Sequence, residues 1–345
     1  MKTTLLFLTV FLSAPLFGQN VYIPDANFKT YLVGNPDINT NGDTEIQLSE
    51  ATAFDGQIVC NYENIFDLTG IEAFTALTSL SCYFNQLTSL DLSQNTALYY
   101  LRCDNNELTG LDVGQNTALT HLECSSNQLI SLDVSQNIAL TVLNCGGNQL
   151  TGLDVSQNIA LTVLNCGGNQ LTGLDVSQNT ALTVLGCGGY QLTSLDVSQN
   201  TALEGLYCAN NQLTSLDVSQ NIALTELYCF DNQLTCLNVA NGNNIDFSYF
   251  ITSENPNLDC VQVDNAEWSS ANWTGFNGQI DPQMYFSEDC NNDCSSSASL
   301  SELTISKNLI KILDLMGRET SFKPNTPLIY VYDDGSIEKV FSVEY

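Results

Sequence analysis

The chain has 345 residues, of which 43% are hydrophobic, so it is long enough for two or three domains and apolar enough to fold. Eight basic residues face 38 acidic ones, and the formal net charge is −30. Such a surface repels phosphate backbones and anionic lipid headgroups, which excludes nucleic acids and membrane surfaces as expected partners.

Residues 1–19 have the composition of a secretory signal peptide. Lys2 precedes an apolar run over residues 5–12, and small residues follow near Gly18. The run is too short to cross a bilayer and no later segment is longer, so no transmembrane segment is expected. We therefore expect an exported mature protein that begins near residue 20.

Residues 20–58 are predicted to form a small helical N-terminal cap around a polar loop. The loop resembles a calcium-binding EF-hand read from its first ligand position onward. The resemblance assigns the Ca²⁺ ligands to Asn39, Asn41, Asp43, the carbonyl position at Glu45 and the bidentate carboxylate of Glu50. Thr44 stands where the family has Gly, and the first ligand is Asn instead of Asp. The alternative is a cap loop built from Asn turns, with no cofactor.

Residues 59–243 repeat with a period of 21 residues. The aligned unit reads L-x-x-L-x-C-x-x-N-x-L-x-x-L-D-V-x-x-N-x-A, and near-identical copies start at Leu140 and Leu161. Each half of the unit alternates like a short strand with one buried face. A fixed period of this length is typical of a solenoid, in which each coil covers the apolar face of its neighbour. We predict a mainly β fold with two short parallel strands per coil.

One cysteine occurs in every unit, and we call the set the cysteine column. Its members are Cys82, Cys103, Cys124, Cys145, Cys166, Cys187, Cys208 and Cys229, and Cys60 begins the column early. The alternation of each strand predicts that these cysteine side chains point into the core. In-register side chains on strands about 4.8 Å apart keep their Cβ atoms farther apart than the roughly 3.8 Å of a disulfide. We predict buried free thiols with a structural role.

Two polar positions also repeat in every unit. Asparagines equivalent to Asn106 and Asn116 follow the strands, where they can bond backbone groups at the bends or bond one another, and Tyr190 replaces one of them. Aspartates equivalent to Asp112 form an outward column. Because this column recurs in every coil, we interpret it as architectural, with each carboxylate bonding a nearby amide.

These units resemble the leucine-rich-repeat family in a short bacterial form that has Cys at the third strand position. The resemblance covers Leu77 to Val239. It implies a scaffold for protein interaction or surface recognition, and it does not imply an enzyme.

The outward positions of the first strand vary at the two ends of the solenoid and are bland in its middle. Aromatic and acidic residues at these positions predict a binding face for a protein or a polysaccharide. The candidates are Tyr83, Tyr100, Arg102, His121, Glu123, Tyr207, Glu226, Tyr228 and Phe230.

Other functions remain as alternatives. The first is a structural spacer or adhesin stalk, in which the repeats supply only length. A calcium-dependent polysaccharide-active enzyme is a further alternative, but the single histidine, His121, has no Ser, Cys or metal partner in the pattern. Ice binding is not favoured, because the threonine column lacks the outward Thr-x-Thr pair.

Residues 244–293 are predicted to form a C-terminal cap, followed by a linker over residues 294–299. In an oxidising compartment, a disulfide between Cys260 and Cys290 is our prediction. Cys236 and Cys294 lie close enough in sequence to offer other pairings.

Residues 300–345 alternate like strands and hold five of the eight basic residues. Asp334-Gly335 predicts a hairpin between two of these strands. The segment is similar to the C-terminal sorting domains of the type IX secretion system, chiefly over Lys311 to Glu319. The resemblance implies contact with the secretion machinery and a location outside the cell or on the outer surface of a Gram-negative bacterium.

Overall fold

The computed structural model describes residues 18–189, 191–274, 279–291, 294, 309–313, 318, 320, 327–332 and 337–341. The chain divides into two compact units, 1–295 and 296–345. The predicted signal peptide before residue 18 and the linker after Cys294 lie outside the described residues.

The first unit begins with two short helices, α1 (Ala26–Val33) and α2 (Leu48–Ala53). The Asp25 carboxylate accepts hydrogen bonds from the amides of Asn27 and Phe28, which satisfies the free N–H groups at the start of α1. Phe28 and Leu32 are one turn apart and fully buried. The helices therefore close the end of the solenoid, as a cap must.

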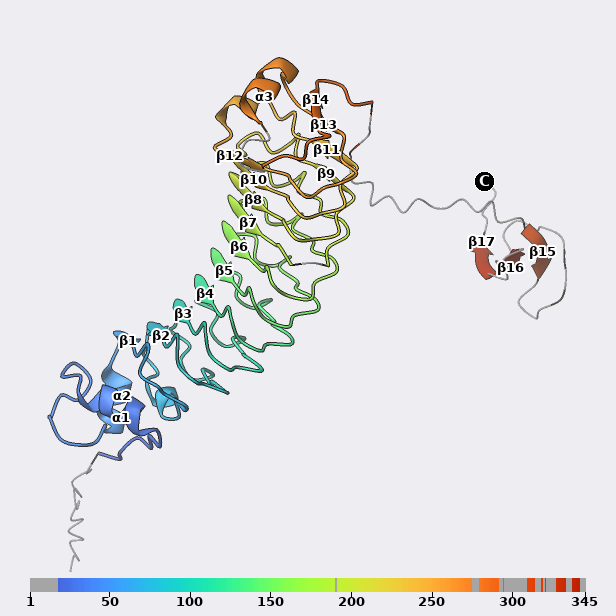
Figure 1. Ribbon diagram of the computed structural model, residues 1–345. Helices are drawn as coiled ribbons and strands as arrows, with labels where there is room; N and C mark the ends of the chain where they lie inside the picture. Colours follow the sequence, from blue (N-terminus) through green and yellow to red (C-terminus); the bar gives the residue numbers. More distant parts are fainter. Residues whose placement is uncertain are drawn as a thin grey trace, which may run out of the picture. The chain divides into compact units, whose positions relative to one another are not determined.

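A ten-stranded parallel sheet runs along the concave side of the curved solenoid, in the order β1-β2-β3-β4-β5-β6-β7-β8-β10-β12 (Figure 1). One residue triplet per coil forms each strand, and the central residue packs into the core in most strands of this sheet. The strands are β1 (Gln57–Val59), β2 (Ser79–Ser81), β3 (Tyr100–Arg102), β4 (His121–Glu123), β5 (Val142–Asn144), β6 (Val163–Asn165), β7 (Val184–Gly186), β8 (Gly205–Tyr207), β10 (Glu226–Tyr228) and β12 (Tyr249–Ile251). The predicted mainly β solenoid of short parallel strands is confirmed.

The second half of the coil forms strands only toward the C-terminal end. These are β9 (Ser215–Asp217), β11 (Cys236–Asn238), β13 (Cys260–Gln262) and β14 (Tyr285–Ser287), in the order β14-β13-β11-β9. The prediction of two strands in every coil therefore holds only for these coils. Elsewhere this half of the coil lies on the outer side of the bend (Figure 1), and no strand is formed there in the described residues.

Two columns of buried asparagines join successive coils. In the first column, Asn106 donates to the carbonyls of Cys82 and Cys103 and accepts a hydrogen bond from the Leu87 amide. In the second, Asn116 donates to the carbonyls of Leu92 and Asn95. In both columns these side chains bond the backbone of the preceding coil and not one another. The expected bonds to backbone groups are therefore present, and the expected bonds between stacked asparagine side chains are corrected. Tyr190 lies outside the described residues.

Short helices and an aromatic cluster cover the C-terminal end of the solenoid. The helix α3 (Ala266–Asn272) and the 3-10 turn η2 (Asn244–Asp246) belong to this end of the unit, whereas the 3-10 turn η1 (Ile71–Ala73) lies between β1 and β2 in the chain. Trp273 is buried and stacks on Phe250, with 4.2 Å between ring centroids. The structure joins Cys260 to Cys290, the pair predicted from the sequence, and Cys236 to Cys294. The two bridges attach the end of the unit to β13 and β11.

The second unit contains the antiparallel strands β15 (Leu309–Leu313), β16 (Pro327–Tyr332) and β17 (Ile337–Phe341), in that order in the sheet. Val331 pairs with Ile337, so β16 and β17 form the expected hairpin. Its Asp334-Gly335 turn lies outside the described residues.

None of the helices in the described ranges is long and apolar enough to span a membrane.

Candidate binding face

The strands place two residues per coil on the concave surface, which we call the strand face. In most of β3–β12 the first and third residues are partly exposed while the middle one is buried. The residue after each core cysteine adds a third row. All nine residues predicted for the face lie in these rows, since the strands are paired in register.

Near the N-terminal end of the strand face, Arg102 is held on three sides, and we call its surroundings the arginine cluster. Its Nε lies 2.7 Å from Asp104 and 3.5 Å from Glu123. Its guanidinium carbon lies 3.9 Å from the ring centroid of Tyr83, a cation–π contact. Asp104 is almost fully buried. The sequence pattern gives no signal of this burial, which accompanies the contact with Arg102.

Tyr100 and His121 border the arginine cluster. The Tyr100 hydroxyl donates to Glu123, and burial, followed by the charge of Glu123, raises the pKa of Tyr100. The His121 ring lies 5.9 Å from the Tyr100 ring, and its Nδ1 is 2.9 Å from the Thr120 hydroxyl. No serine or cysteine nucleophile contacts His121 in the described hydrogen bonds.

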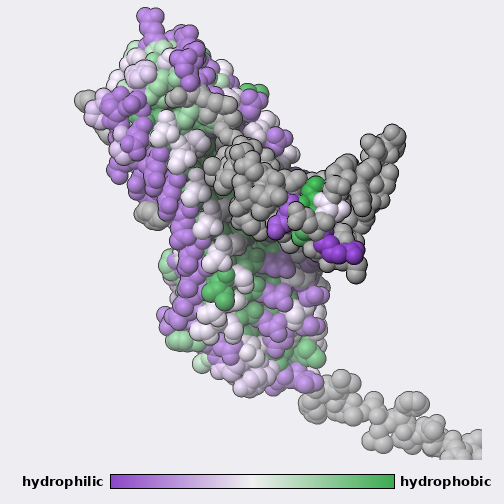
Figure 2. Space-filling view, turned by 90° about the vertical axis from the view of Figure 1, so that its right-hand side faces the viewer, coloured by the Kyte–Doolittle hydropathy of each residue, from purple (hydrophilic) through white to green (hydrophobic). Residues whose placement is uncertain are grey.

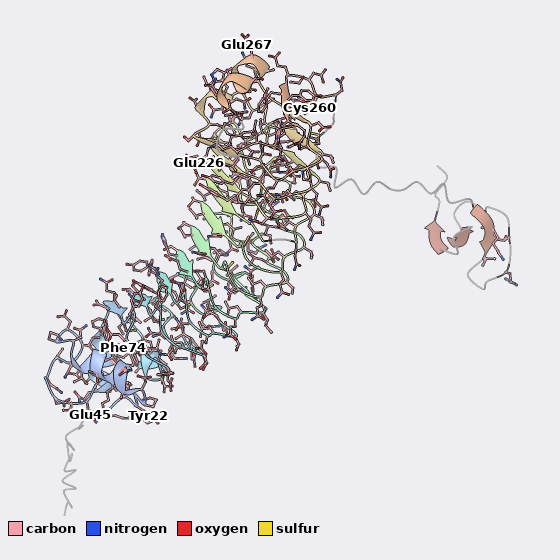
Figure 3. The ribbon with its side chains drawn as sticks, viewed as in Figure 1. Tyr22, Glu45, Phe74, Glu226, Cys260 and Glu267 are labelled. Carbon is pink, nitrogen blue, oxygen red and sulfur yellow. A yellow bond between two sulfur atoms is a disulfide. The ribbon has the colours of Figure 1, made fainter. Side chains whose placement is uncertain are left out.

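At the other end of the strand face, Tyr207, Glu226, Tyr228 and Tyr249 form what we call the tyrosine cluster. Ring centroids are 5.1 Å apart for Tyr207 and Tyr228, and 5.9 Å apart for Tyr228 and Tyr249. The Tyr207 hydroxyl donates to Glu226, and this bond, with burial, raises the pKa of Tyr207 to about 12. Figure 3 shows Glu226 on the strand side of the solenoid.

Tyr249 was missed in the sequence although a signal was present. It follows Tyr228 at the same 21-residue spacing that separates Tyr228 from Tyr207. In the structure it pairs with Glu226 and not with Tyr228, because the coil between them is longer. The repeat pattern ends before this coil, so the spacing alone did not place the residue on the face.

An open hollow of about 550 Å³ lies between the two clusters. Its floor is apolar, with Val142, Val163 and Val184 side by side in neighbouring strands. Tyr207, Tyr228 and Phe230 bound one end, and Glu123 the other. The middle coils, which looked bland in the sequence, therefore form the floor of a depression.

The floor is low because the coils approach too closely for side chains. A Cβ on Gly167 would lie 2.7 Å from the carbonyl oxygen of Gly188, and one on Gly188 would lie 2.8 Å from that of Ala209. Both distances are shorter than packed carbon and oxygen atoms allow. Glycine is thus required by packing, and the hollow is its consequence.

The predicted calcium loop is a hydrogen-bonded turn that leads into α2. Glu50 accepts hydrogen bonds from the amides of Gln47, Thr40 and Asn41 and from the Thr40 hydroxyl. Burial would raise the pKa of Glu50, yet these bonds lower it below its ordinary value. Asn39 donates to the carbonyls of Val33 and Asp43.

The other predicted ligands make hydrogen bonds within the loop. Asp43 accepts from the Glu45 amide and from Asn41. The Glu45 carboxylate, which is not the predicted ligand atom of that residue, pairs with Lys29 at 2.7 Å. Within the described ranges, no group of three or more His, Cys, Asp or Glu side chains is placed to hold a metal ion. Calcium binding by this loop stays a prediction of the sequence.

The cysteine column lies in the core as free thiols. All nine cysteines from Cys60 to Cys229 are buried and unpaired. Burial raises the pKa of Cys60, Cys166 and Cys229 to about 12. A thiol that stays protonated is a poor nucleophile and a poor metal ligand, so the column is structural.

The aspartates of the column opposite the strand face each stabilise a turn of their own coil. The Asp112 carboxylate accepts a hydrogen bond of 2.9 Å from the amide two residues on, and the equivalent aspartates do the same. This bond lowers the pKa of Asp91 and Asp175. Figure 2, which views the right-hand side of Figure 1, shows many hydrophilic residues beside scattered hydrophobic ones.

Comparison with known proteins gives a sequence relative and several structural ones, and no family model matches the chain. Internalin J of Listeria monocytogenes serotype 4b (strain F2365) is 40% identical over 77 residues, which is 22% of this chain and 8% of that protein. The functional domain of InlJ from Listeria monocytogenes, which includes a cysteine ladder, matches with a TM-score of 0.64 and 41% identity, over 72% of this chain and 58% of that one. The chain thus spans less than two thirds of either.

A second internalin, InlF of Listeria monocytogenes, matches at 21% identity with a TM-score of 0.52, over 72% of this chain and 86% of that one. This likeness concerns the fold alone. The two matches to internalin J concern the repeats, and the solved InlJ domain also includes a cysteine ladder. None of the three matches identifies a ligand of this chain.

Proposed function

Because the solenoid has the leucine-rich-repeat fold and a sequence similar to that of internalin J, we propose that this chain is a secreted or cell-surface recognition protein. Its ligand is a protein that binds along the strand face. Binding, not turnover, is the role we assign, since the polar side chains of the face are engaged with one another.

The distribution of side chains on the strand face carries the proposal. Core and bend positions hold the same residue types in coil after coil, whereas the arginine and tyrosine clusters occur once each. Both clusters are ordered by hydrogen bonds before any ligand arrives, which lowers the entropy lost on binding. A spacer stalk has no need of either cluster.

The chemistry of the hollow favours a protein over a polysaccharide. Valine, tyrosine and phenylalanine side chains line much of it, beside Asn144, Asn165 and Asn210, and apolar side chains of a partner gain free energy by leaving water there. The net charge of −30 adds a preference for a neutral or basic partner.

We propose that export uses a type IX-like secretion system that reads the C-terminal unit. The resemblance of residues 311–319 to sorting domains supports this route, and the antiparallel sheet of β15, β16 and β17 is consistent with a small domain of that kind. A Gram-negative outer surface would be the destination.

The test is a binding screen of the full chain on arrays of extracellular proteins and of glycans. For any hit, we compare a variant with Tyr100, Arg102, Tyr207 and Tyr228 changed to Ala against a control with Ile130, Ile138 and Ile159 changed to Ala. The control residues are at least as exposed and lie off the strand face. Loss of binding in the first variant only supports the proposal; equal binding by both refutes it.

A further inference from the structure

We propose that the tyrosine cluster binds a cationic side chain, lysine or arginine, of an extended segment in the partner protein. An apolar side chain of the same segment then occupies the valine-floored hollow beside it. This inference rests on the proposed function, because it assumes that the strand face is the binding face.

Glu226 carries a charge that no cation balances. In the described residues of the first unit, Lys29 pairs with Glu45, and Arg102 pairs with Asp104 and Glu123, so neither of these cations pairs with Glu226. Glu226 instead accepts a hydrogen bond from the neutral Tyr207 hydroxyl. Because Tyr207 keeps its proton to a pH of about 12, it orients the carboxylate without neutralising it. A half-buried carboxylate so placed gains most from a cation that arrives with its own donors.

The other end of the same face shows how this chain fills such a site. There, the Arg102 guanidinium lies over the Tyr83 ring and between the carboxylates of Asp104 and Glu123. The tyrosine cluster has the same parts, namely tyrosine rings and a carboxylate, but it lacks the cation. Arg102 is the only basic residue between Lys29 and Lys307, so the repeats offer no second one.

The local packing keeps the site open. Gly205 occupies the strand position between Val184 and Glu226, and a Cβ there would lie 3.0 Å from Cε2 and 3.1 Å from Oη of Tyr207. The Tyr207 ring therefore lies across this glycine and forms a continuous surface from the hollow to the carboxylate. Tyr249, at the end of the sheet, is about half exposed, and no further strand of that sheet follows it in the described part of the chain.

The spacing suits a short peptide motif. Val184 and Glu226 are two coils apart, a separation of about 10 Å. In an extended peptide, residues i and i+2 point to the same side and lie about 7 Å apart. The stem of a lysine or arginine covers the remaining distance, so an apolar residue two positions before a basic one matches both subsites.

The experiment titrates the full chain with acetyl-Leu-Ser-Arg-amide and with the same peptide carrying citrulline, which keeps the shape of arginine without its charge. We expect the arginine peptide to bind about 3- to 30-fold more tightly by calorimetry at low salt. In Glu226→Gln this ratio falls to about one. As the matched control, Glu107→Gln removes one exposed charge that lies outside the strand face, and we expect this variant to keep the ratio.

The proposal is overturned by equal affinities for the two peptides, by a ratio that survives Glu226→Gln, or by no binding of either peptide at millimolar concentration. Thermal melting checks that both variants fold. Failure of the proposed function is distinct. If the array ligand depends on the strand face but is indifferent to Glu226→Gln, recognition stands and the cationic subsite falls.

Discussion

The second asparagine column shows how one side chain type both joins the coils and limits their packing. Each of these residues donates two hydrogen bonds to the preceding coil. Their Oδ1 atoms are buried and have no donor within the part of the chain that the structure describes; the residues are Asn95, Asn116, Asn137, Asn158, Asn179, Asn200 and Asn221. A buried carbonyl oxygen without a donor costs about 1–3 kcal/mol, so the two donated bonds must outweigh that cost in each coil.

Asn137→Ala tests this balance in the middle of the solenoid. The change removes two buried hydrogen bonds, to the carbonyls of Val113 and Asn116, each of which keeps one backbone donor. We expect the free energy of unfolding to fall by about 1–3 kcal/mol, from the lost bonds and the cavity left behind. Chemical denaturation measures the loss. The neighbour Gln136 is exposed and bonds only Ser135, so Gln136→Ala should change stability by less than about 0.5 kcal/mol. Similar losses in the two variants would contradict the role of the column.

At Gly167 the absence of a side chain is a packing requirement. We expect Gly167→Ala to destabilise the protein by about 1–3 kcal/mol, because its Cβ would meet the Gly188 carbonyl at 2.7 Å. Gly173 belongs to the same repeat unit as Gly167, and its Cβ would meet nothing within 4 Å, so Gly173→Ala is the matched control. Melting temperatures of the two variants measure the difference, and a control that loses as much as Gly167→Ala would remove the explanation of the hollow.

Among the elements, the cysteine column makes stability depend on pH in the alkaline range. The folded-state pKa of Cys60, Cys166 and Cys229 is raised to about 12 from an ordinary value of 9.0. A thiol with a raised folded-state pKa contributes its full stability below pH 9 and loses it as the pH rises toward 12. We therefore expect the denaturation midpoint to be insensitive to thiol ionisation at neutral pH and to fall steadily above pH 9.

The same burial predicts kinetic protection of the thiols. At pH 8 in the absence of denaturant, we expect the nine free cysteines to resist a thiol reagent, and all nine to react after unfolding. Labelling followed by mass spectrometry counts them. Rapid modification of the native protein would place the column outside the core.

The coil as an element was predictable from its sequence in one half and not in the other. Leucine and cysteine at fixed spacing placed the strands from β2 to β10, because only one register buries that set. The Leu-Asp-Val half has an equally clear alternation, yet it forms strands only from β9 onward. Whether neighbouring coils come close enough to pair depends on the curvature of the whole stack, which no single unit encodes.

The candidate site was predictable to a similar extent. The alternation within the repeat predicted which of its residues lie on the strand face, including Arg102 and Glu226. It did not give Tyr249, which lies in a longer coil, nor the burial of Asp104, which follows from its contact with Arg102. The EF-hand resemblance predicted which residues would bind Ca²⁺, whereas in the structure the Glu50 carboxylate accepts hydrogen bonds from backbone amides of its own loop.

For the whole molecule, export is the property assigned to the second unit. We expect deletion of residues 299–345 to prevent the protein from reaching the cell exterior, because the sorting resemblance lies in this segment. Immunodetection in the medium and on intact cells measures the outcome in a Gram-negative host that has a type IX system. The control keeps the full length and replaces residues 295–298 with glycines. Unchanged surface display of the deleted form would rule out the segment as an address.

The near-identical middle coils set the distance between the two clusters. Each coil contacts its neighbours through the same leucines, cysteines and asparagines, so one 21-residue unit can be inserted or removed without altering either end. Every such event would change the separation between Arg102 and Glu226 by one fixed step of about 5 Å. The number of duplicated units therefore sets the distance between the two clusters in fixed steps. Gene duplication alone could adapt the chain to ligands of different lengths, with no contact residue mutated.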